Sequence, residues 1–219
     1  VILVGSFRSA VQTAEEMNVH GANVYAVTGN LGDRQEITYI FNKCMELFDG
    51  RIDILVNGAG VQFRSDAVDF PAEECERVIS INLIAVFYLS QMVGKVMIEH
   101  KYGKIINIAS MTSFFGSERI PAYTASKAGI AQLTKALSNE WARSGVNVNA
   151  IAPGYMATKL TQDIKEKNPK QYQEITSRSP AGRWGTGEDL KGLAVFLASD
   201  ASAYISVAVI PVDGGYLGK

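Results

Sequence analysis

Strand-like runs alternate with helix-like segments along almost the whole chain, and this alternation is the feature that most restricts its fold. Short apolar runs rich in Val, Ile and Ala are followed by segments in which apolar residues recur at helical spacing. This order is typical of a parallel sheet with helices on both faces, because each parallel strand needs a crossover connection to reach the next. The predicted strands cover residues 1–4, 22–28, 52–56, 104–110, 146–151 and 207–212, and the predicted helices cover 9–18, 33–49, a long segment from 71, 123–143 and 188–198.

We expect these elements to form one domain over residues 1–219, since no repeat, low-complexity tract or linker interrupts the pattern. The length allows a sizeable core, and 47% hydrophobic with 20% charged residues is an ordinary globular composition. A net charge of −1 provides no positive surface for nucleic acid or anionic membranes. The composition therefore fits a soluble protein that binds a small molecule.

The longest apolar segment, residues 78–93, is interrupted by polar side chains, which favours a core or interface helix over a membrane span. Cys44 and Cys75 belong to no cluster of metal ligands, so we expect buried thiols and no metal site. No signal peptide opens the chain, and its last residues form no sorting address. These features predict a cytoplasmic location.

A serine, a tyrosine and a lysine form the strongest candidate site. The spacing Tyr-x-x-x-Lys occurs three times, and chance alone is expected to produce about half a match, so the spacing by itself carries little weight. Only Tyr123 with Lys127 has a serine thirteen residues earlier, and that serine, Ser110, ends a buried strand. The same step back from Tyr39 or Tyr155 reaches an alanine.

The three residue types suit proton transfer to or from an alcohol oxygen. Residues four apart share one face of a helix, so Tyr123 and Lys127 can point into the same cleft. A free phenol titrates near pH ~10, and a neighbouring ammonium stabilises the phenolate and lowers that pKa. We therefore expect Lys127 to bring Tyr123 into the range of a general acid or base, with Ser110 holding the substrate oxygen.

The chain resembles the short-chain dehydrogenase/reductase family. The residues that carry the resemblance are spread from the first strand to the C-terminal Val212–Gly215, and they include Asn82, Ser110, Tyr123, Lys127, Asn57-Gly-Ala-Gly60 and Pro153-Gly154. Within the family the chain is most similar to sugar-acid and polyol dehydrogenases, through stretches such as Asn147–Thr158 and Pro180–Gly185. The resemblance implies a Rossmann-like, doubly wound α/β fold. It also implies an NAD(P)-dependent oxidoreductase of carbohydrate metabolism that interconverts a carbonyl and a hydroxyl on a sugar acid, sugar or polyol.

The resemblance also implies a role for each residue of the site. Tyr123 would be the acid/base, Lys127 its electrostatic partner and a ribose contact, Ser110 the residue that orients the carbonyl, and Asn82 the holder of a relay water. The cofactor contacts that it implies are Arg8, Asn30, Leu31, Asn57, Gly58, Ala59, Gly60, Tyr123, Lys127, Pro153, Gly154, Met156 and Thr158.

The choice between the two nicotinamide cofactors depends on the residues after the first strand. An acidic residue there would favour the bare ribose hydroxyl of NAD(H), whereas an arginine would favour the extra phosphate of NADP(H). The chain has Phe7-Arg8-Ser9 at this position, so NADP(H) is favoured and NAD(H) remains possible. Arg8 as a plain surface charge and Asn30 as a plain turn residue remain the alternatives.

The glycine-rich turn that receives the cofactor pyrophosphate in this family is not found in the sequence. The closest candidate, Ala26–Gly32, is one glycine short, and Asp33 would place a negative charge against the phosphate. By alignment with the family, residue 1 starts the second strand. We therefore expect an N-terminally incomplete domain with two unpaired strand edges in the middle of the sheet. The rival interpretation is a catalytically silent structural or regulatory relative that has lost cofactor binding.

Substrate contacts and assembly are less strongly indicated. A sugar acid needs a cation for its carboxylate, and Arg64, Arg119 and Arg183 are the candidates. Family resemblance implies a homotetramer or homodimer built through the long helices and the C-terminal strand. Ser206-Val207 stands where the family has a glycine after a small polar residue, so we expect unusual packing there. The particular substrate and the direction of the reaction do not follow from the sequence.

Overall fold

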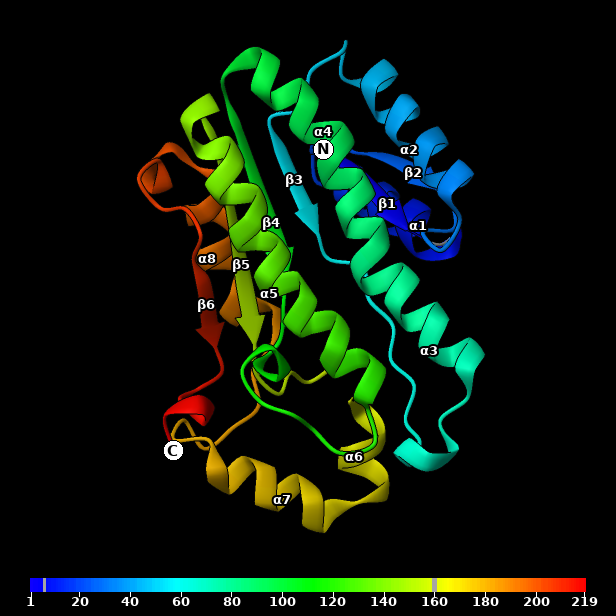
Figure 1. The fold of residues 1–219 in the computed structure, drawn as a ribbon, viewed down its shortest axis with the longest axis vertical. Coiled ribbons are helices and arrows are strands. Elements are labelled where there is room, and N and C mark those ends of the chain that lie inside the picture. The colour runs from blue at the N-terminus through cyan, green and yellow to red at the C-terminus, as the bar shows by residue number, and fades with distance from the viewer. Residues whose placement is uncertain (6, 159–160) are drawn as a thin grey trace.

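A computed structural model describes residues 1–5, 7–158 and 161–219, with side chains at these positions except 7–9, 162, 163 and 165. Strands and helices alternate as predicted (Figure 1). The strands are β1 (Ile2–Gly5), β2 (Tyr25–Thr28), β3 (Ile54–Asn57), β4 (Gly103–Ile108), β5 (Val146–Pro153) and β6 (Val209–Val212). The α-helices are α1 (Phe7–Val19), α2 (Arg34–Leu47), α3 (Ala72–Ile79), α4 (Ala85–His100), α5 (Pro121–Trp141), α6 (Gln162–Lys167), α7 (Pro169–Arg178) and α8 (Gly187–Ala198).

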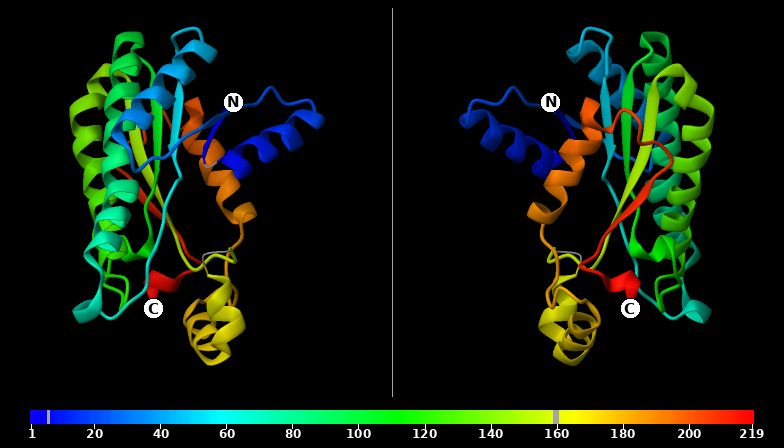
Figure 2. Two further views of the ribbon diagram at one scale, coloured as in Figure 1. Left: turned by 90° about the vertical axis from the view of Figure 1, so that its right-hand side faces the viewer. Right: turned by 90° about the vertical axis from the view of Figure 1, so that its left-hand side faces the viewer.

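The strands are parallel and lie between two layers of helices, so the predicted α/β fold class is confirmed. Helices α4 and α5 cover one face, and α8 and α1 lie on the other (Figure 2). Adjacent residues of β4 point to opposite faces: Ile105 packs in the core under α4 and α5, whereas Ile106 packs with Leu197 of α8. Both isoleucines are at most 1% exposed, as expected for a central strand that is buried on both sides.

The sheet is divided into two parts. Strands β3-β4-β5-β6 form one parallel sheet, and β1-β2 form a separate parallel pair. The strands of a doubly wound fold lie in the order 3-2-1-4-5-6, in the numbering of the general fold. The space between β1 and β3 of this structure corresponds to the position of strand 1 in that numbering. The predicted pair of unpaired edges is confirmed, and apolar side chains beside them stay accessible: Val4 is 38% exposed and Val56 is 53% exposed.

The long apolar segment forms one continuous helical stretch over Ala72–His100, which is long and apolar enough to cross a membrane by length and composition. Its α4 part contributes Val93 and Met97 to the core against β3 and β4, which supports the interpretation as a core helix. A π-helical turn, Ser80–Ile84, joins α3 to α4. Asn82 lies in this turn and is fully buried.

Three local features differ from the sequence expectations or extend them. Helices α6 and α7 lie in a polar stretch where no element was predicted, and the side chain of Asn168 caps α7 by accepting a hydrogen bond from the Gln171 amide at 3.2 Å. Cys75 is exposed rather than buried, because it lies on the outer face of α3. Val207 adopts a left-handed backbone with φ of 71°, where a β-branched residue is strained.

Candidate active site

Four side chains from three elements meet at the carboxyl edge of the sheet. Ser110 follows β4, where it caps the short 3-10 helix Met111–Ser113, and Tyr123 and Lys127 lie one turn apart on α5. The Ser110 hydroxyl lies close enough to the Tyr123 phenol to lower its pKa, and the Lys127 ammonium lies 5.8 Å from the centre of the Tyr123 ring. The spatial convergence predicted from the sequence is therefore present.

The pKa values of the pair differ in direction from the sequence expectation. Burial raises the pKa of Tyr123 above its usual value, and only the hydrogen bond from Ser110 lowers it. Burial also lowers the pKa of Lys127 to about 8. In the protein without ligands the phenol pKa is thus raised, whereas the sequence predicted that it would be lowered. The physical reason is that desolvation acts on both groups, while the Lys127 ammonium donates to the Ile108 carbonyl at 2.6 Å.

Asn82 hydrogen-bonds the backbone of the segment that follows β3. Its side-chain oxygen accepts from the Val61 amide at 2.8 Å, and its side-chain nitrogen donates to the Val61 carbonyl at 2.9 Å and to the Ser126 hydroxyl at 3.2 Å. A Cβ added to Gly60 would lie 3.6 Å from the Asn82 oxygen and 3.7 Å from the Lys127 nitrogen. Gly60, Asn82 and Lys127 therefore surround one small region beside the phenol.

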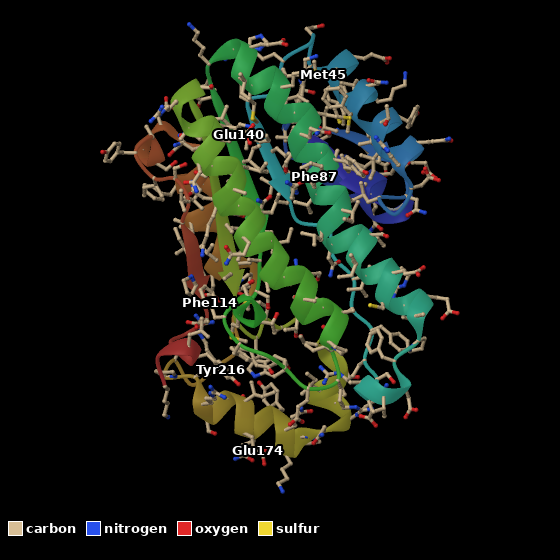
Figure 3. The ribbon with its side chains drawn as sticks, viewed as in Figure 1. Met45, Phe87, Phe114, Glu140, Glu174 and Tyr216 are labelled. Carbon is tan, nitrogen blue, oxygen red and sulfur yellow. The ribbon has the colours of Figure 1, made fainter. Side chains whose placement is uncertain are left out.

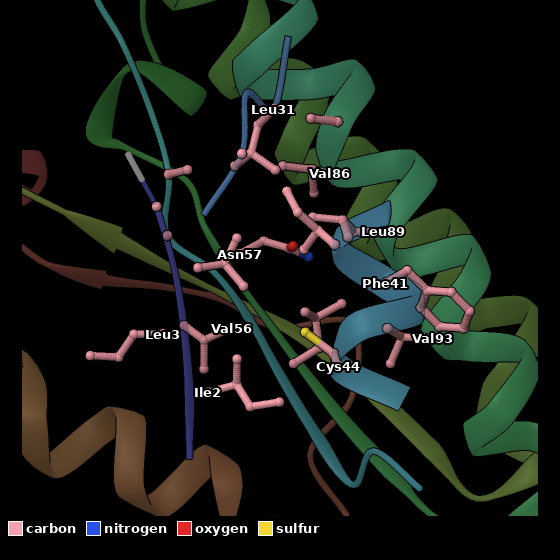
Figure 4. A pocket seen from close by; sticks show the side chains of 18 of the residues that line it. Ile2, Leu3, Leu31, Phe41, Cys44, Val56, Asn57, Val86, Leu89 and Val93 are labelled. Atoms are coloured by element: carbon pink, nitrogen blue, oxygen red, sulfur yellow. The ribbon is translucent and has the colours of Figure 1, made fainter. Parts of the chain in front are cut away.

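A large cavity of about 1510 Å³ adjoins this region and extends between β1 and β3 (Figure 4). Its walls include apolar residues of β1, β3, α2 and α4 together with six of the predicted cofactor contacts after β2 and β3: Asn30, Leu31, Asn57, Gly58, Ala59 and Gly60. In Figure 4, Cys44, Leu89 and Val93 border the space opposite Ile2 and Val56. The cavity thus reaches from the space between β1 and β3 to the end of the sheet where a dinucleotide binds in this fold.

The remaining predicted cofactor contacts lie along the loop after β5. Gly154 donates its amide to the Val212 carbonyl at 2.9 Å, which holds the loop against the end of β6. Met156 pairs with Gly185 in an isolated bridge, and Thr158 is exposed. The side chain of Arg8 lies outside the described residues, so the structure does not place it.

A buried polar network behind the site escaped the sequence reasoning. The Asn57 side chain donates to the Ser90 hydroxyl at 3.1 Å and to the Asn107 side-chain oxygen at 2.9 Å. Asn107 in turn donates to the Thr134 hydroxyl at 2.9 Å, so the network joins β3, β4, α4 and α5. A fully buried asparagine in the apolar run Ile105–Ile108 was the signal that could have revealed it.

The three arginines predicted as substrate contacts have different surroundings. Arg119 pairs with Asp66 at 2.9 Å, and Arg183 pairs with Asp189 at 2.7 Å and 2.8 Å near the start of α8. Arg64 has no carboxylate partner within the described ranges 1–5, 7–158 and 161–219. Of the three, only Arg64 is therefore available to an anion without breaking an ion pair.

Known proteins resemble the chain over most of its length. A family model described as enoyl-(acyl carrier protein) reductase matches residues 1–217. A 2-dehydro-3-deoxy-D-gluconate 5-dehydrogenase from Bacillus subtilis is 50% identical over 181 residues, which make up 82% of this chain and 71% of the relative. The relative from Dickeya dadantii with the same name is 44% identical over 209 residues, 95% of this chain and 82% of its own.

Solved structures agree closely with the fold. A chain from Beutenbergia cavernae, named as an NAD(P)-dependent gluconate 5-dehydrogenase with NADP bound, is 41% identical with a TM-score of 0.94, covering 100% of this chain and 87% of its own. The fold and these relatives define an NAD(P)-dependent oxidoreductase with a Rossmann-like domain. The chain belongs to the short-chain dehydrogenase/reductase family.

Proposed function

We propose that this protein interconverts a hydroxyl and a carbonyl on a sugar acid, with NADP(H) as the favoured cofactor. The names of the relatives at 44% and 50% identity support a 2-dehydro-3-deoxy-D-gluconate 5-dehydrogenase activity or one close to it. The NADP bound by the relative from Beutenbergia cavernae supports the cofactor. The single observation that carries the proposal is the convergence of Ser110, Tyr123 and the buried Lys127 at the carboxyl edge of the sheet.

NADP(H), held along the cavity wall after β3, would supply the hydride chemistry of the reaction. The chain's own residues handle the proton and the oxygen. Ser110 orients the substrate oxygen by a hydrogen bond, and Tyr123 takes the hydroxyl proton as the carbonyl forms. As long as Lys127 keeps its proton, its positive charge stabilises the phenolate. Asn82 holds the adjacent segment in place. In the reduction direction Tyr123 returns the proton to the oxygen as hydride reaches the carbon.

The residues of the cavity fit the nucleoside parts of the cofactor. Small residues at Gly58, Ala59 and Gly60 leave the backbone after β3 open to the cavity, so a ribose can approach it closely. The Asn57 side chain is occupied by Ser90 and Asn107, so its role would be to fix this backbone rather than to touch the cofactor. Lys127 lies at the inner end of this wall, where it could contact a nicotinamide ribose.

The substitution Tyr123→Phe tests the proposal. We expect it to lower kcat at least ~100-fold, the usual size of a positioned acid/base, with unchanged thermal stability. Tyr39→Phe is the matched control, because Tyr39 also lies four residues before a lysine but is 52% exposed on α2. Turnover of NADPH with a panel of keto sugar acids is the measurement. A Tyr123→Phe variant that keeps wild-type turnover contradicts the proposed role.

The open space between β1 and β3 favours a second candidate, a silent relative that does not bind the cofactor. Titrating the protein with NADPH and following nucleotide fluorescence separates the two. A saturable shift that Lys127→Met weakens supports the enzyme. No shift up to millimolar NADPH supports the silent relative.

We also propose a homodimer or homotetramer that uses the outer faces of the long helices. Ile84 and Phe87 support this, because they are 41% and 36% exposed next to the buried side of α4. Sedimentation velocity of the wild type and of Phe87→Glu checks the assembly.

A further inference from the structure

A cluster of aromatic side chains lies at the carboxyl edge of the sheet, next to the proposed catalytic residues. Tyr155 lies 5.3 Å from Trp184 and 5.5 Å from Tyr216 between ring centres. Tyr216 belongs to the C-terminal turn Tyr216–Gly218 and lies next to α7 (Figure 3). Met111, the residue after Ser110, packs in the same cluster.

The strand register places Tyr155 close to Ser110. Ile108 of β4 pairs with Ile151 of β5, so the residues two positions further on, Ser110 and Pro153, leave the sheet side by side. Tyr155 follows Pro153 by two residues and is partly exposed. The cluster is therefore a wall beside the place where the substrate oxygen would be held.

Two arginines from distant parts of the chain have guanidinium groups that act on the Tyr155 phenol. Arg178, the last residue of α7, lies with its guanidinium 4.4 Å from the centre of the Tyr216 ring. Arg64 lies just before Ser65, whose amide donates to the Arg119 carbonyl at 3.0 Å in the loop that leads into α5. Both guanidinium groups act on Tyr155, since each of them lowers the pKa of its phenol against a larger rise caused by burial.

Neither guanidinium is neutralised by a carboxylate within the part of the chain that the structure describes. Both side chains are exposed, so a dissolved anion can reach them. An arginine that stacks on a ring uses its flat face, and its N–H groups remain free in the plane to bind a carboxylate through two hydrogen bonds. Two free cations next to a site for hydroxyl oxidation match a substrate that carries both groups.

We propose that Arg178, stacked on Tyr216, and Arg64 together form the subsite that binds the carboxylate of a sugar acid. This inference rests on the proposed function and assigns the acid group of the substrate to named residues. Arg178 was not among the cations singled out from the sequence, because α7 lies in a stretch without a predicted element. The indole N–H of Trp184 is buried without a hydrogen-bond partner in the described structure, so the cluster contains a donor that a ligand or a water could satisfy.

Binding of two probes that differ only in the acid group tests the subsite. The probes are D-gluconate and the neutral polyol D-glucitol, and the readout is tryptophan fluorescence, because Trp184 lies in the cluster and the second tryptophan, Trp141, lies in the core at the far end of α5. We expect saturable binding of gluconate by the wild type. Arg178→Gln and Arg64→Gln should each weaken it at least ~10-fold, the scale of a charged hydrogen bond. Glucitol binding should not change.

Arg34→Gln is the matched control, because Arg34 also stacks on a tyrosine, with its guanidinium 4.7 Å from the ring of Tyr88. It should bind gluconate as the wild type does. Arg178→Lys keeps the charge and loses the planar fork, and we expect an intermediate affinity. Thermal melting of each variant shows whether the fold is kept, and Arg64→Gln tests the subsite independently if Arg178→Gln unfolds.

Three results would overturn the subsite: no saturable gluconate binding by the wild type, wild-type affinity in both glutamine variants, or an equal loss of glucitol binding. The NADPH titration on the same sample reports separately on the proposed function. If NADPH binds and keto sugar acids are reduced while the arginine variants behave as wild type, only the subsite is wrong.

Discussion

The two halves of the sheet contrast sharply. On one side, β4 and β5 are paired on both edges, covered on both faces, and hold the Ser110 end of the site in a closed core. On the other side, β1 and β3 each have one unpaired edge, and a cavity of about 1510 Å³ separates them. The acid/base residues Ser110, Tyr123 and Lys127 are therefore held by β4 and α5, in the closed half.

Hydrogen exchange should show the largest difference between the halves. Amides of β4 exchange only when the closed core opens, whereas amides on the free edges of β1 and β3 face the cavity. We expect the free-edge amides to exchange at least ~1,000-fold faster than those of residues 105–107, since global opening typically costs about 5 kcal/mol or more. Exchange followed by mass spectrometry or NMR measures this. Equal protection in both halves would mean that the free edges are covered in solution.

Truncation of one isoleucine in each half sharpens the same comparison. Ile105 is fully buried, and Ile105→Ala should lower the free energy of unfolding by about 3 kcal/mol. Ile54, which is 45% exposed, pairs with Lys104 at the neighbouring strand, and Ile54→Ala should cost about 1 kcal/mol or less. Urea denaturation measures both values. The idea of a closed and an open half fails if the two costs are the same.

The buried Lys127 should give stability a pH dependence. Its pKa is lowered from 10.5 to about 8 in the folded protein, so between these values the unfolded chain keeps a proton that the folded chain has lost. Unfolding then takes up a proton, and the free energy of unfolding rises with pH across this window, by at most about 3 kcal/mol. Lys127→Met should lack this rise. Denaturation from pH 7 to 10.5, wild type against variant, is the measurement.

The same titration predicts a pH limit for the reduction. Loss of the Lys127 proton above pH ~8 removes the charge that stabilises the Tyr123 phenolate, so kcat/KM should fall as pH rises through this range. A profile of kcat/KM that stays flat from pH 7 to 10 would contradict this role for Lys127.

The smallest expected effect is at the start of β6. Val207 has φ of 71°, so a glycine there would relieve backbone strain. Glycine also loses more entropy on folding, which offsets part of this gain. We therefore expect Val207→Gly to raise the free energy of unfolding by only about 1 kcal/mol. Val209→Gly, in the regular part of β6, should lower it. Thermal melting of both variants checks the pair.

Sequence periodicity predicted the strands and the larger helices, because their apolar residues repeat with the spacing of the structure that they form. Spacing also placed Ser110, Tyr123 and Lys127 together, and the resemblance to the family identified Ser206-Val207 as unusual. Helices α6 and α7 were missed because they are stabilised by contacts of Ile164 and Ile175 with the cluster around Trp184, which only the folded chain brings together.

The electrostatics of the site could not be predicted for a related reason. The sign of the Tyr123 shift depends on how deeply the phenol is buried, and a sequence does not give depth. Likewise, the sequence alone does not distinguish Arg183 from Arg64, and only the structure shows that Asp189 already binds Arg183. Spacing gives proximity along an element, whereas burial and partners follow from the packing of several elements.

The π-helical turn at Ser80–Ile84 has a consequence for how the chain can change in length. A π turn holds one more residue than an α turn, so removing a single residue there would restore a regular helix with little damage to its hydrogen bonds. That deletion would also rotate everything before it by about 100° around the helix axis. Helix α3 and the loop preceding it would then face away from the substrate side, so insertions and deletions in this short stretch should be much less tolerated than substitutions.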